Sequence, residues 1–102
     1  MSISAIGAAF SSLTRASAAL GDGLAPLADD GLQAALRSMD DSMRSLTVTG
    51  GTYGTRTLDE AIRHANQALD ALDDGALIAA REHVRTAQFG LDLLLPGGGR
   101  VI

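Results

Sequence analysis

The sequence contains no cysteine and no tryptophan, and it has only three aromatic residues, Phe10, Tyr53 and Phe89. Without cysteine, neither a disulfide framework nor a thiolate zinc site can form, so packing alone must stabilise the chain. A core built mainly from alanine, leucine and isoleucine suits closely packed helices better than a sheet, whose strands are enriched in aromatic and β-branched residues. These absences favour an all-α fold.

Lysine is also absent, and the eight arginines are scattered among twelve acidic residues, which gives a net charge of −4. Binding to a nucleic-acid backbone needs clustered positive charge, so we expect no nucleic-acid partner. No apolar run approaches the roughly 20 residues of a membrane-spanning helix, and the first residues lack the basic region of a secretory signal. We therefore expect no membrane span and a protein that is cytoplasmic or part of an assembled particle.

The clearest pattern lies in two adjacent stretches, Thr57 to Asp73 and Gly75 to Leu95, which only Asp74 separates. Both carry apolar residues at steps of three and four, as one face of a helix requires. Because alanine holds one of the two seam positions in each arm, the pattern predicts a tight antiparallel helical hairpin. The two stripes consist of Leu58, Ala61, Ala65, Ala68 and Leu72 in the first arm, and of Leu77, Ala80, Val84, Ala87, Leu91 and Leu94 in the second.

The N-terminal half predicts two further helices. The first carries a stripe of Ile3, Ile6, Phe10, Leu13 and Leu20. Glycines and Pro26 then favour a connection, and the second helix carries a stripe of Leu32, Leu36, Met39, Met43 and Leu46 opposite a charged face of Arg37, Asp40, Asp41 and Arg44. We expect a small all-α bundle of about four helices, over residues 3–20, 30–46, 58–73 and 75–95, in a single domain of residues 1–95.

Two segments break the helical period. Residues 47–56 hold three glycines and several threonines, which predicts a loop or at most a short two-stranded turn. Thr57 and Glu60 fit the reciprocal arrangement in which both side chains cap a helix start, so the third helix should begin there. Pro96 and the run Gly97 to Gly99 end the fourth helix, which leaves residues 96–102 as a glycine-rich tail.

The chain has only two histidines, His64 and His83. Counting back from a turn near Asp74 places His64 level with His83 or Val84, on the same side of the seam. With Glu60 one turn from His64, these residues are the candidates for a divalent metal site or a pH response. The alternative is a pair of partly exposed imidazoles without a ligand. We expect no cofactor and no metal, and keep a metal- or pH-responsive module as an alternative function.

No motif in the sequence predicts catalysis. There is no cysteine nucleophile, no serine in a glycine-flanked elbow and no phosphate loop, because Gly97 to Gly99 follows a helix and lacks the required lysine. The segment His83 to Thr86 differs from the histidine box of sensor kinases, since it is one residue short before the arginine and no proline follows. We therefore expect that the protein is not an enzyme.

Surplus apolar side chains indicate a protein partner instead. The leucines of residues 91–95 exceed what one seam can bury, so Leu93 or Leu95 should face a partner. Met39 and Met43 are further interface candidates, because methionine adapts to varied surfaces, although filling a core is its commoner use. We expect a structural or adaptor subunit of a larger assembly, such as a phage-like particle or a secretion machine, with a protein partner or self-association covering these side chains.

The length of 102 residues, the absence of cysteine and the two helical halves around a glycine-containing loop resemble the small WXG-type helical hairpins that specialised bacterial secretion systems export. This resemblance implies export without a classical signal peptide. The chain departs from the family because it has no tryptophan, because Tyr53 and Gly54 do not reproduce the spaced pair, and because the tyrosine-based C-terminal signal is absent. Pro26 and the turn at Asp74 also divide the chain into four helices where that family has two. An exported hairpin is therefore a second alternative.

Overall fold

The fold is a bundle of four helices. The computed structural model describes the backbone of residues 3–48 and 54–94, and the side chains of residues 5–45 and 54–94. These ranges form α1 (Ile3–Gly21), α2 (Ala25–Val48), α3 (Thr55–Asp73) and α4 (Leu77–Leu94), with no β-strand among them. The predicted all-α class is confirmed.

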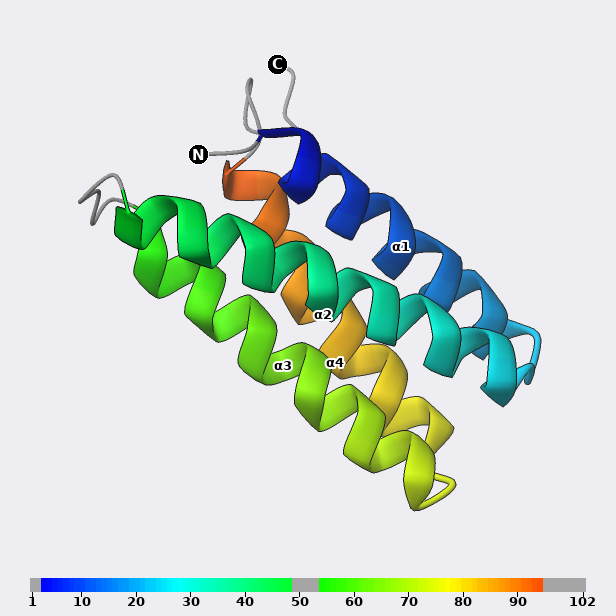
Figure 1. The fold of residues 1–102 in the computed structure, drawn as a ribbon. Coiled ribbons are helices and arrows are strands. Elements are labelled where there is room, and N and C mark those ends of the chain that lie inside the picture. Colours follow the sequence, from blue (N-terminus) through cyan, green and yellow to red (C-terminus); the bar gives the residue numbers. More distant parts are fainter. Residues whose placement is uncertain (1–2, 49–53, 95–102) are drawn as a thin grey trace.

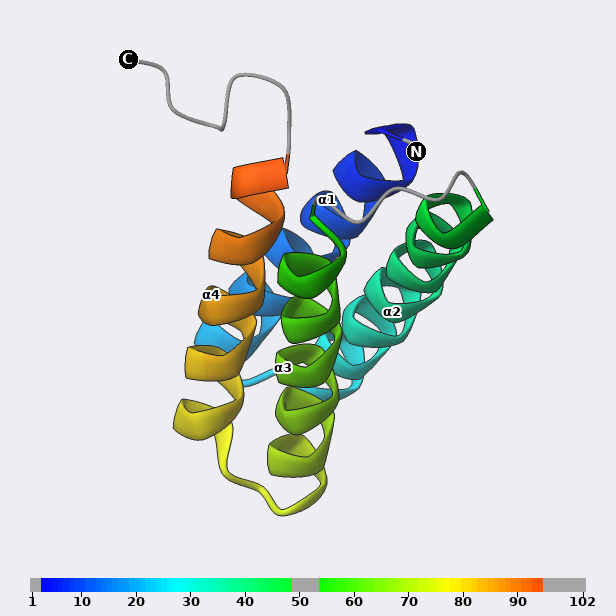
Figure 2. The same cartoon turned by 90° about the vertical axis from the view of Figure 1, so that its left-hand side faces the viewer.

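The helices form two antiparallel hairpins, α1–α2 and α3–α4, that lie against each other (Figure 1). Each helix packs against its neighbours in the chain, and α1 also packs against α4, so the four helices make a closed ring. The two short connecting turns lie at one end of the bundle, and the ends of the helices that border residues 1–2 and 95–102 lie at the other (Figures 1 and 2). Gln88 on α4 links the hairpins by donating a hydrogen bond to the Thr14 hydroxyl on α1 at 3.0 Å.

The second hairpin repeats the first at a fixed offset in the sequence. Thr55 lies 52 positions after Ile3, and Leu77 lies 52 positions after Ala25, so corresponding helices start at the same spacing. We call residues 52 positions apart counterparts. Eight counterpart positions are buried in both hairpins, and four of them carry an alanine in both: Ala9 with Ala61, Ala16 with Ala68, Ala28 with Ala80, and Ala35 with Ala87.

The two connecting turns share one backbone geometry. Gly23 has a φ of +73°, and the following amide of Leu24 donates to the carbonyl of Ala19 at 2.8 Å. Its counterpart Gly75 has a φ of +75°, and Ala76 donates the equivalent bond, also at 2.8 Å. This pattern ends a helix at a left-handed residue, which is why glycine stands at both turns. The chain therefore reverses within a few residues in each hairpin.

Two predicted helix starts are wrong because these turns are so short. The second helix begins at Ala25 and not near residue 30, since Pro26 occupies its first turn, where the missing amide removes no hydrogen bond. The fourth helix begins at Leu77 and not at Gly75, because the left-handed glycine belongs to the turn. The predicted break between residues 21 and 29 is therefore only a short turn.

The predicted start of the third helix is also wrong. The helix begins at Thr55, its N-cap is Gly54 with a φ of +86°, and no side chain makes a capping hydrogen bond. Thr57 and Glu60 consequently lie inside the helix, where they do not form the expected capping pair. Val48 and Thr55 are helical, so the loop expected over residues 47–56 is shorter. Residues 49–53 and the expected tail at 96–102 lie outside the described residues.

One core joins the two hairpins, and its inner stripes match the sequence pattern. In α3 and α4 every predicted stripe residue is buried or partly buried, with Leu72, Leu77 and Leu94 at the margins. Buried alanines in all four helices belong to this core, together with larger apolar side chains. The largest fully buried apolar side chains are Ile6, Leu13, Leu32, Met39, Leu58, Val84 and Leu91.

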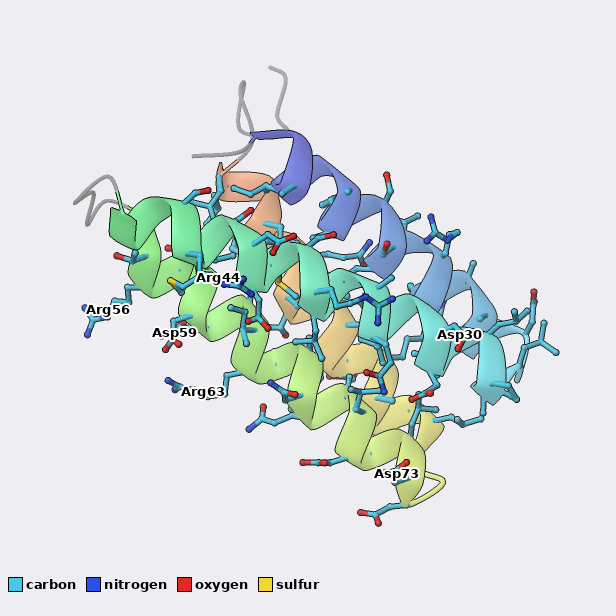
Figure 3. The ribbon with its side chains drawn as sticks, in the orientation of Figure 1. Asp30, Arg44, Arg56, Asp59, Arg63 and Asp73 are labelled. Atoms are coloured by element: carbon cyan, nitrogen blue, oxygen red, sulfur yellow. The ribbon has the colours of Figure 1, made fainter. Side chains whose placement is uncertain are left out.

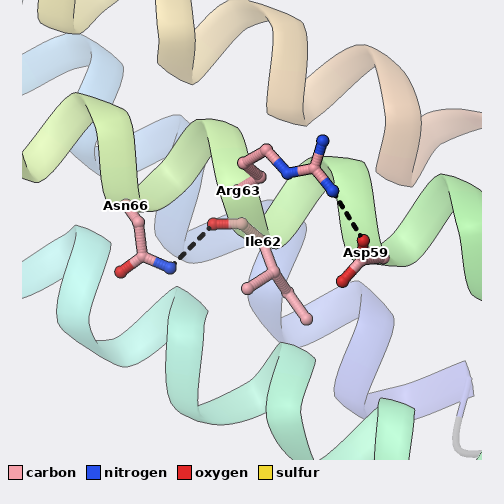
Figure 4. Close-up of polar contacts among 4 residues, drawn as sticks. All are labelled: Asp59, Ile62, Arg63 and Asn66. Atoms are coloured by element: carbon pink, nitrogen blue, oxygen red, sulfur yellow. Dashed lines mark hydrogen bonds and ion pairs between the residues drawn. The ribbon is translucent and has the colours of Figure 1, made fainter.

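Charged side chains point away from the bundle, including Arg44, Arg56 and Asp73 (Figure 3). On the exposed face of α3, the Arg63 guanidinium lies 3.0 Å from the Asp59 carboxylate (Figure 4). The predicted charged face of α2 is likewise exposed. Among the described helices, none is both long enough and apolar enough to cross a membrane.

Candidate functional site

The two histidines meet on the outer face of the second hairpin. His64 on α3 and His83 on α4 bring their Nδ1 atoms to 3.1 Å, with ring centroids 5.3 Å apart and ring planes tilted by 31°. Both side chains are partly buried. The predicted pairing across the seam is therefore confirmed.

The separation of 3.1 Å is that of a hydrogen bond between the two imidazoles. In a neutral pair, one ring carries its proton on Nδ1 and donates it to the unprotonated Nδ1 of the other ring. Two protonated rings could not share this contact, because both Nδ1 atoms would then be donors. Each Nδ1 atom therefore has its hydrogen-bond partner in the other ring, and both rings remain partly exposed to solvent.

Glu60 does not complete a three-residue metal site with the two histidines. Within residues 3–48 and 54–94, no group of three or more histidine, cysteine, aspartate or glutamate side chains is placed to hold a metal ion. Glu60 is exposed on α3, one turn before His64. The protein ligands available at this position are therefore the two imidazoles.

The first hairpin shows what packing alone requires at the same place. The counterparts of His64 and His83 are Ser12 and Gly31, which are both buried. A Cβ atom added at Gly31 would lie 3.0 Å from the carbonyl oxygen of Ser12 and 3.1 Å from the Cβ of Ala16. The first hairpin closes on a glycine where the second holds two rings, so an antiparallel helix pair of this plan forms without imidazoles but is packed differently at this level.

A depression of about 180 Å³ adjoins the histidine pair on the same outer face. Phe89 and Leu93 border it on α4 and are 63% and 52% exposed. Small residues, including Ala61 and Gly90, line it between the two helices. We call this surface the α3–α4 outer face; its lining residues are Thr57, Glu60, Ala61, His64, Thr86, Phe89, Gly90 and Leu93.

The predicted interface residues fall into different environments. Leu93 is exposed on the α3–α4 outer face. Met39 is fully buried and fills the core, so its assignment to an interface is wrong. Met43 is partly buried and packs against the core from its edge. Leu95 lies outside the described residues.

Sequence reasoning did not identify the exposed apolar side chains of Leu24, Leu27, Ile78 and Phe89. Phe89 lies between the stripe residues Ala87 and Leu91, and this spacing was a signal that it points away from the core. Leu24 and Leu27, which are 45% and 58% exposed, border a depression of about 540 Å³ near the turn of the first hairpin. They were missed because the segment was interpreted as a connection, whereas Leu27 belongs to α2.

Comparisons with protein-family models, with curated proteins and with solved structures return no match.

Proposed function

We propose that the protein is a non-enzymatic structural or adaptor subunit, and that a second copy of the chain covers its α3–α4 outer face. The observation that carries this proposal is the exposure of Phe89 and Leu93 at positions whose counterparts are charged. In the first hairpin these positions hold Arg37 and Asp41, both exposed. The bundle therefore tolerates charges there, and the apolar side chains of the second hairpin call for another explanation.

Phe89 and Leu93 are one helical turn apart, so they form a continuous apolar ridge on α4. Fully burying a leucine or phenylalanine side chain contributes about 1.5–3 kcal/mol. Aromatic side chains, phenylalanine included, are enriched at the cores of protein interfaces. The ridge is thus a suitable centre for a protein contact.

Self-association is favoured because the face carries both a ridge and a hollow. Phe89 projects beside the depression between Ala61 and Gly90. In a twofold dimer the same surface of each copy meets itself, so the ridge of one copy can enter the depression of the other. A stable interface buries about 800 Å² on each chain, which requires that the contact extend along α3 and α4 beyond the ridge.

The test is the mass of the full chain in solution, measured by light scattering over a concentration series in the presence of a chelator. We expect the wild type to give twice the chain mass at high concentration. The double variant Phe89→Arg, Leu93→Asp places the residues of the first hairpin on the second and should give a single chain mass.

Ile78→Arg is the matched control. Ile78 is also on α4 and is 81% exposed, but it does not line the depression. This variant should associate as the wild type does. A wild type that stays monomeric at the highest concentrations, or a dimer that the double variant leaves intact, would contradict the proposal.

A further inference from the structure

We infer that His64 and His83 form a binding site for a divalent transition-metal ion of the class that prefers imidazole, such as Zn²⁺ or Cu²⁺. Nδ1 of each ring supplies one ligand, and water molecules complete the coordination sphere. This site borders the proposed dimer contact, because His64 also lines the depression of the α3–α4 outer face, but both ligands come from one copy of the chain.

The distance between the two nitrogens fits such an ion. With metal–nitrogen bonds of about 2.0–2.1 Å, two ligands of a tetrahedral ion lie about 3.4 Å apart, and adjacent ligands of a square-planar ion lie about 2.9 Å apart. The Nδ1 atoms of His64 and His83 are 3.1 Å apart, between these two values. A metal ion can therefore replace the shared proton after a modest rotation of the rings.

The ligands are held in place before any ion arrives. Each histidine is in the middle of a long helix, and the buried alanines Ala61, Ala68 and Ala80 fix the spacing of α3 and α4. Binding therefore requires no folding of a loop, and little conformational entropy is lost. A preformed pair of imidazoles is a better chelate than two histidines on flexible segments.

The surroundings leave room for water and carry charges of both signs. The depression beside His64 holds about 180 Å³ and opens to solvent. Two exposed carboxylates are near the pair in the chain, Glu60 one turn before His64 and Glu82 next to His83. Arginines flank the histidines too, at Arg63, which pairs with Asp59, and at Arg85.

The first hairpin provides the internal reference for this inference. Its counterparts Ser12 and Gly31 give a buried seam with no metal-binding group. The same helix pairing therefore forms without histidine, and the second hairpin differs by two facing nitrogen ligands. Metal binding accounts for this difference between the two hairpins.

The experiment is a calorimetric titration of the full chain, which carries no histidine tag. Zn²⁺ and Cu²⁺ are titrated separately. We expect one ion per chain and a higher unfolding temperature with the ion than with a chelator. Nitrogen NMR of the imidazoles with Zn²⁺, which is diamagnetic, should show that the ion shifts the Nδ1 resonances of both rings more than the Nε2 resonances. Light scattering with the ion should show no increase in mass beyond that of the chelated protein.

Two single variants test the ligands. His64→Ser reproduces the first hairpin, and His83→Ala removes the second ring while keeping a good helix former. Changes to groups that only support a ligand weaken metal binding about 10–100-fold, so losing either ring should weaken it by at least about tenfold. Glu60→Gln is the control and should change the affinity far less.

Circular dichroism of each variant establishes that the helices remain folded. The inference would be overturned if neither ion bound at concentrations up to about 1 mM, which corresponds to the weakest dissociation constant that would support a site. Binding that survives His64→Ser, or coordination through Nε2, would overturn it as well. The dimer is tested with a chelator present, so its outcome does not depend on metal. Repeating the metal titration on the double variant Phe89→Arg, Leu93→Asp, which cannot form the proposed dimer, lets either proposal fail without the other.

Discussion

The two hairpins have the same backbone plan and different outer faces. Their helices start at the same spacing, and their turns place glycine at the same left-handed position. At matching positions, the first hairpin has a buried serine, a buried glycine and exposed charges, whereas the second has two partly buried histidines and exposed apolar side chains. The residues concerned are Ser12, Gly31, Arg37 and Asp41 in the first hairpin, and His64, His83, Phe89 and Leu93 in the second.

This difference shows which positions the fold constrains. The inner seam tolerates little change, because alanines set how closely two helix backbones approach. The outer face meets solvent in the described structure, so different side chains there preserve the same helix pairing. We therefore expect binding at the outer face of the second hairpin, where the side chains differ from those of the first although the helices pair in the same way.

The largest expected effect concerns a core position where the hairpins differ. Leu13 is fully buried in α1, and its counterpart in α3 is Ala65. Leu13→Ala removes three side-chain carbon atoms, Cγ and the two Cδ methyl groups, from a packed site. It should lower the free energy of unfolding by about 3 kcal/mol. Urea unfolding followed by circular dichroism measures this loss.

Ala65→Leu is the reciprocal variant and should lower the free energy of unfolding by about 1–3 kcal/mol through overpacking. If Leu13→Ala and Ala65→Leu both left the free energy of unfolding unchanged, this would contradict a difference in packing between the hairpins at these two buried positions.

The next effect distinguishes two helical glycines. At Gly31, a Cβ atom would lie 3.0 Å from a carbonyl oxygen of α1, so Gly31→Ala should destabilise the fold by about 1–2 kcal/mol despite its better helix propensity. At Gly90 in α4, the nearest atom would be 3.6 Å away, so Gly90→Ala should stabilise by about 0.5–1 kcal/mol. Thermal unfolding of both variants shows whether each one gains or loses stability. If both changed stability in the same direction, this would contradict a closer approach of the helix backbones at Gly31 than at Gly90.

A smaller effect is expected at Ser42, whose counterpart is the partly buried Leu94. Ser42 is fully buried, and its Oγ has no hydrogen-bond partner among the described residues. Ser42→Ala removes this hydroxyl without leaving a large cavity, so it should stabilise the fold by about 1 kcal/mol. For a domain of this size, that gain corresponds to a rise of about 4–8 °C in the unfolding temperature.

Ser12→Ala is the control for Ser42→Ala, because the Ser12 hydroxyl accepts a hydrogen bond from Arg15 at 3.2 Å and should give no such gain. A Ser42→Ala variant that is less stable than the wild type would show that its hydroxyl is satisfied.

The smallest effect is expected for the ion pair of Arg63 and Asp59, whose counterparts Ser11 and Gly7 form no such pair. Both side chains are more than half exposed, so solvent screens the attraction. Arg63→Ala should change the free energy of unfolding by at most about 0.5 kcal/mol. Repeating the measurement in about 1 M salt, where charges are screened within about 3 Å, should remove the difference.

The sequence predicts the second hairpin well because its signals are local. Stripes such as Leu58, Ala61 and Ala65 define the buried side of α3, and counting residues from the turn brings His64 level with His83. The helix starts were harder, because Pro26 is compatible with a first turn and Gly54 supplies a start that no capping motif marks. The repeat was accessible too, since its counterparts can be read by comparing the sequence with itself at an offset of 52.

The sequence by itself determined the helical stripes and the glycine turns, because periodicity and a left-handed φ involve only residues that are close in the chain. Only the tertiary structure decided that the two Nδ1 atoms stand 3.1 Å apart, that Met39 enters the core, and that Phe89 stays uncovered. These properties depend on the distance and register between helices, which arise from all the side chains in the shared core together.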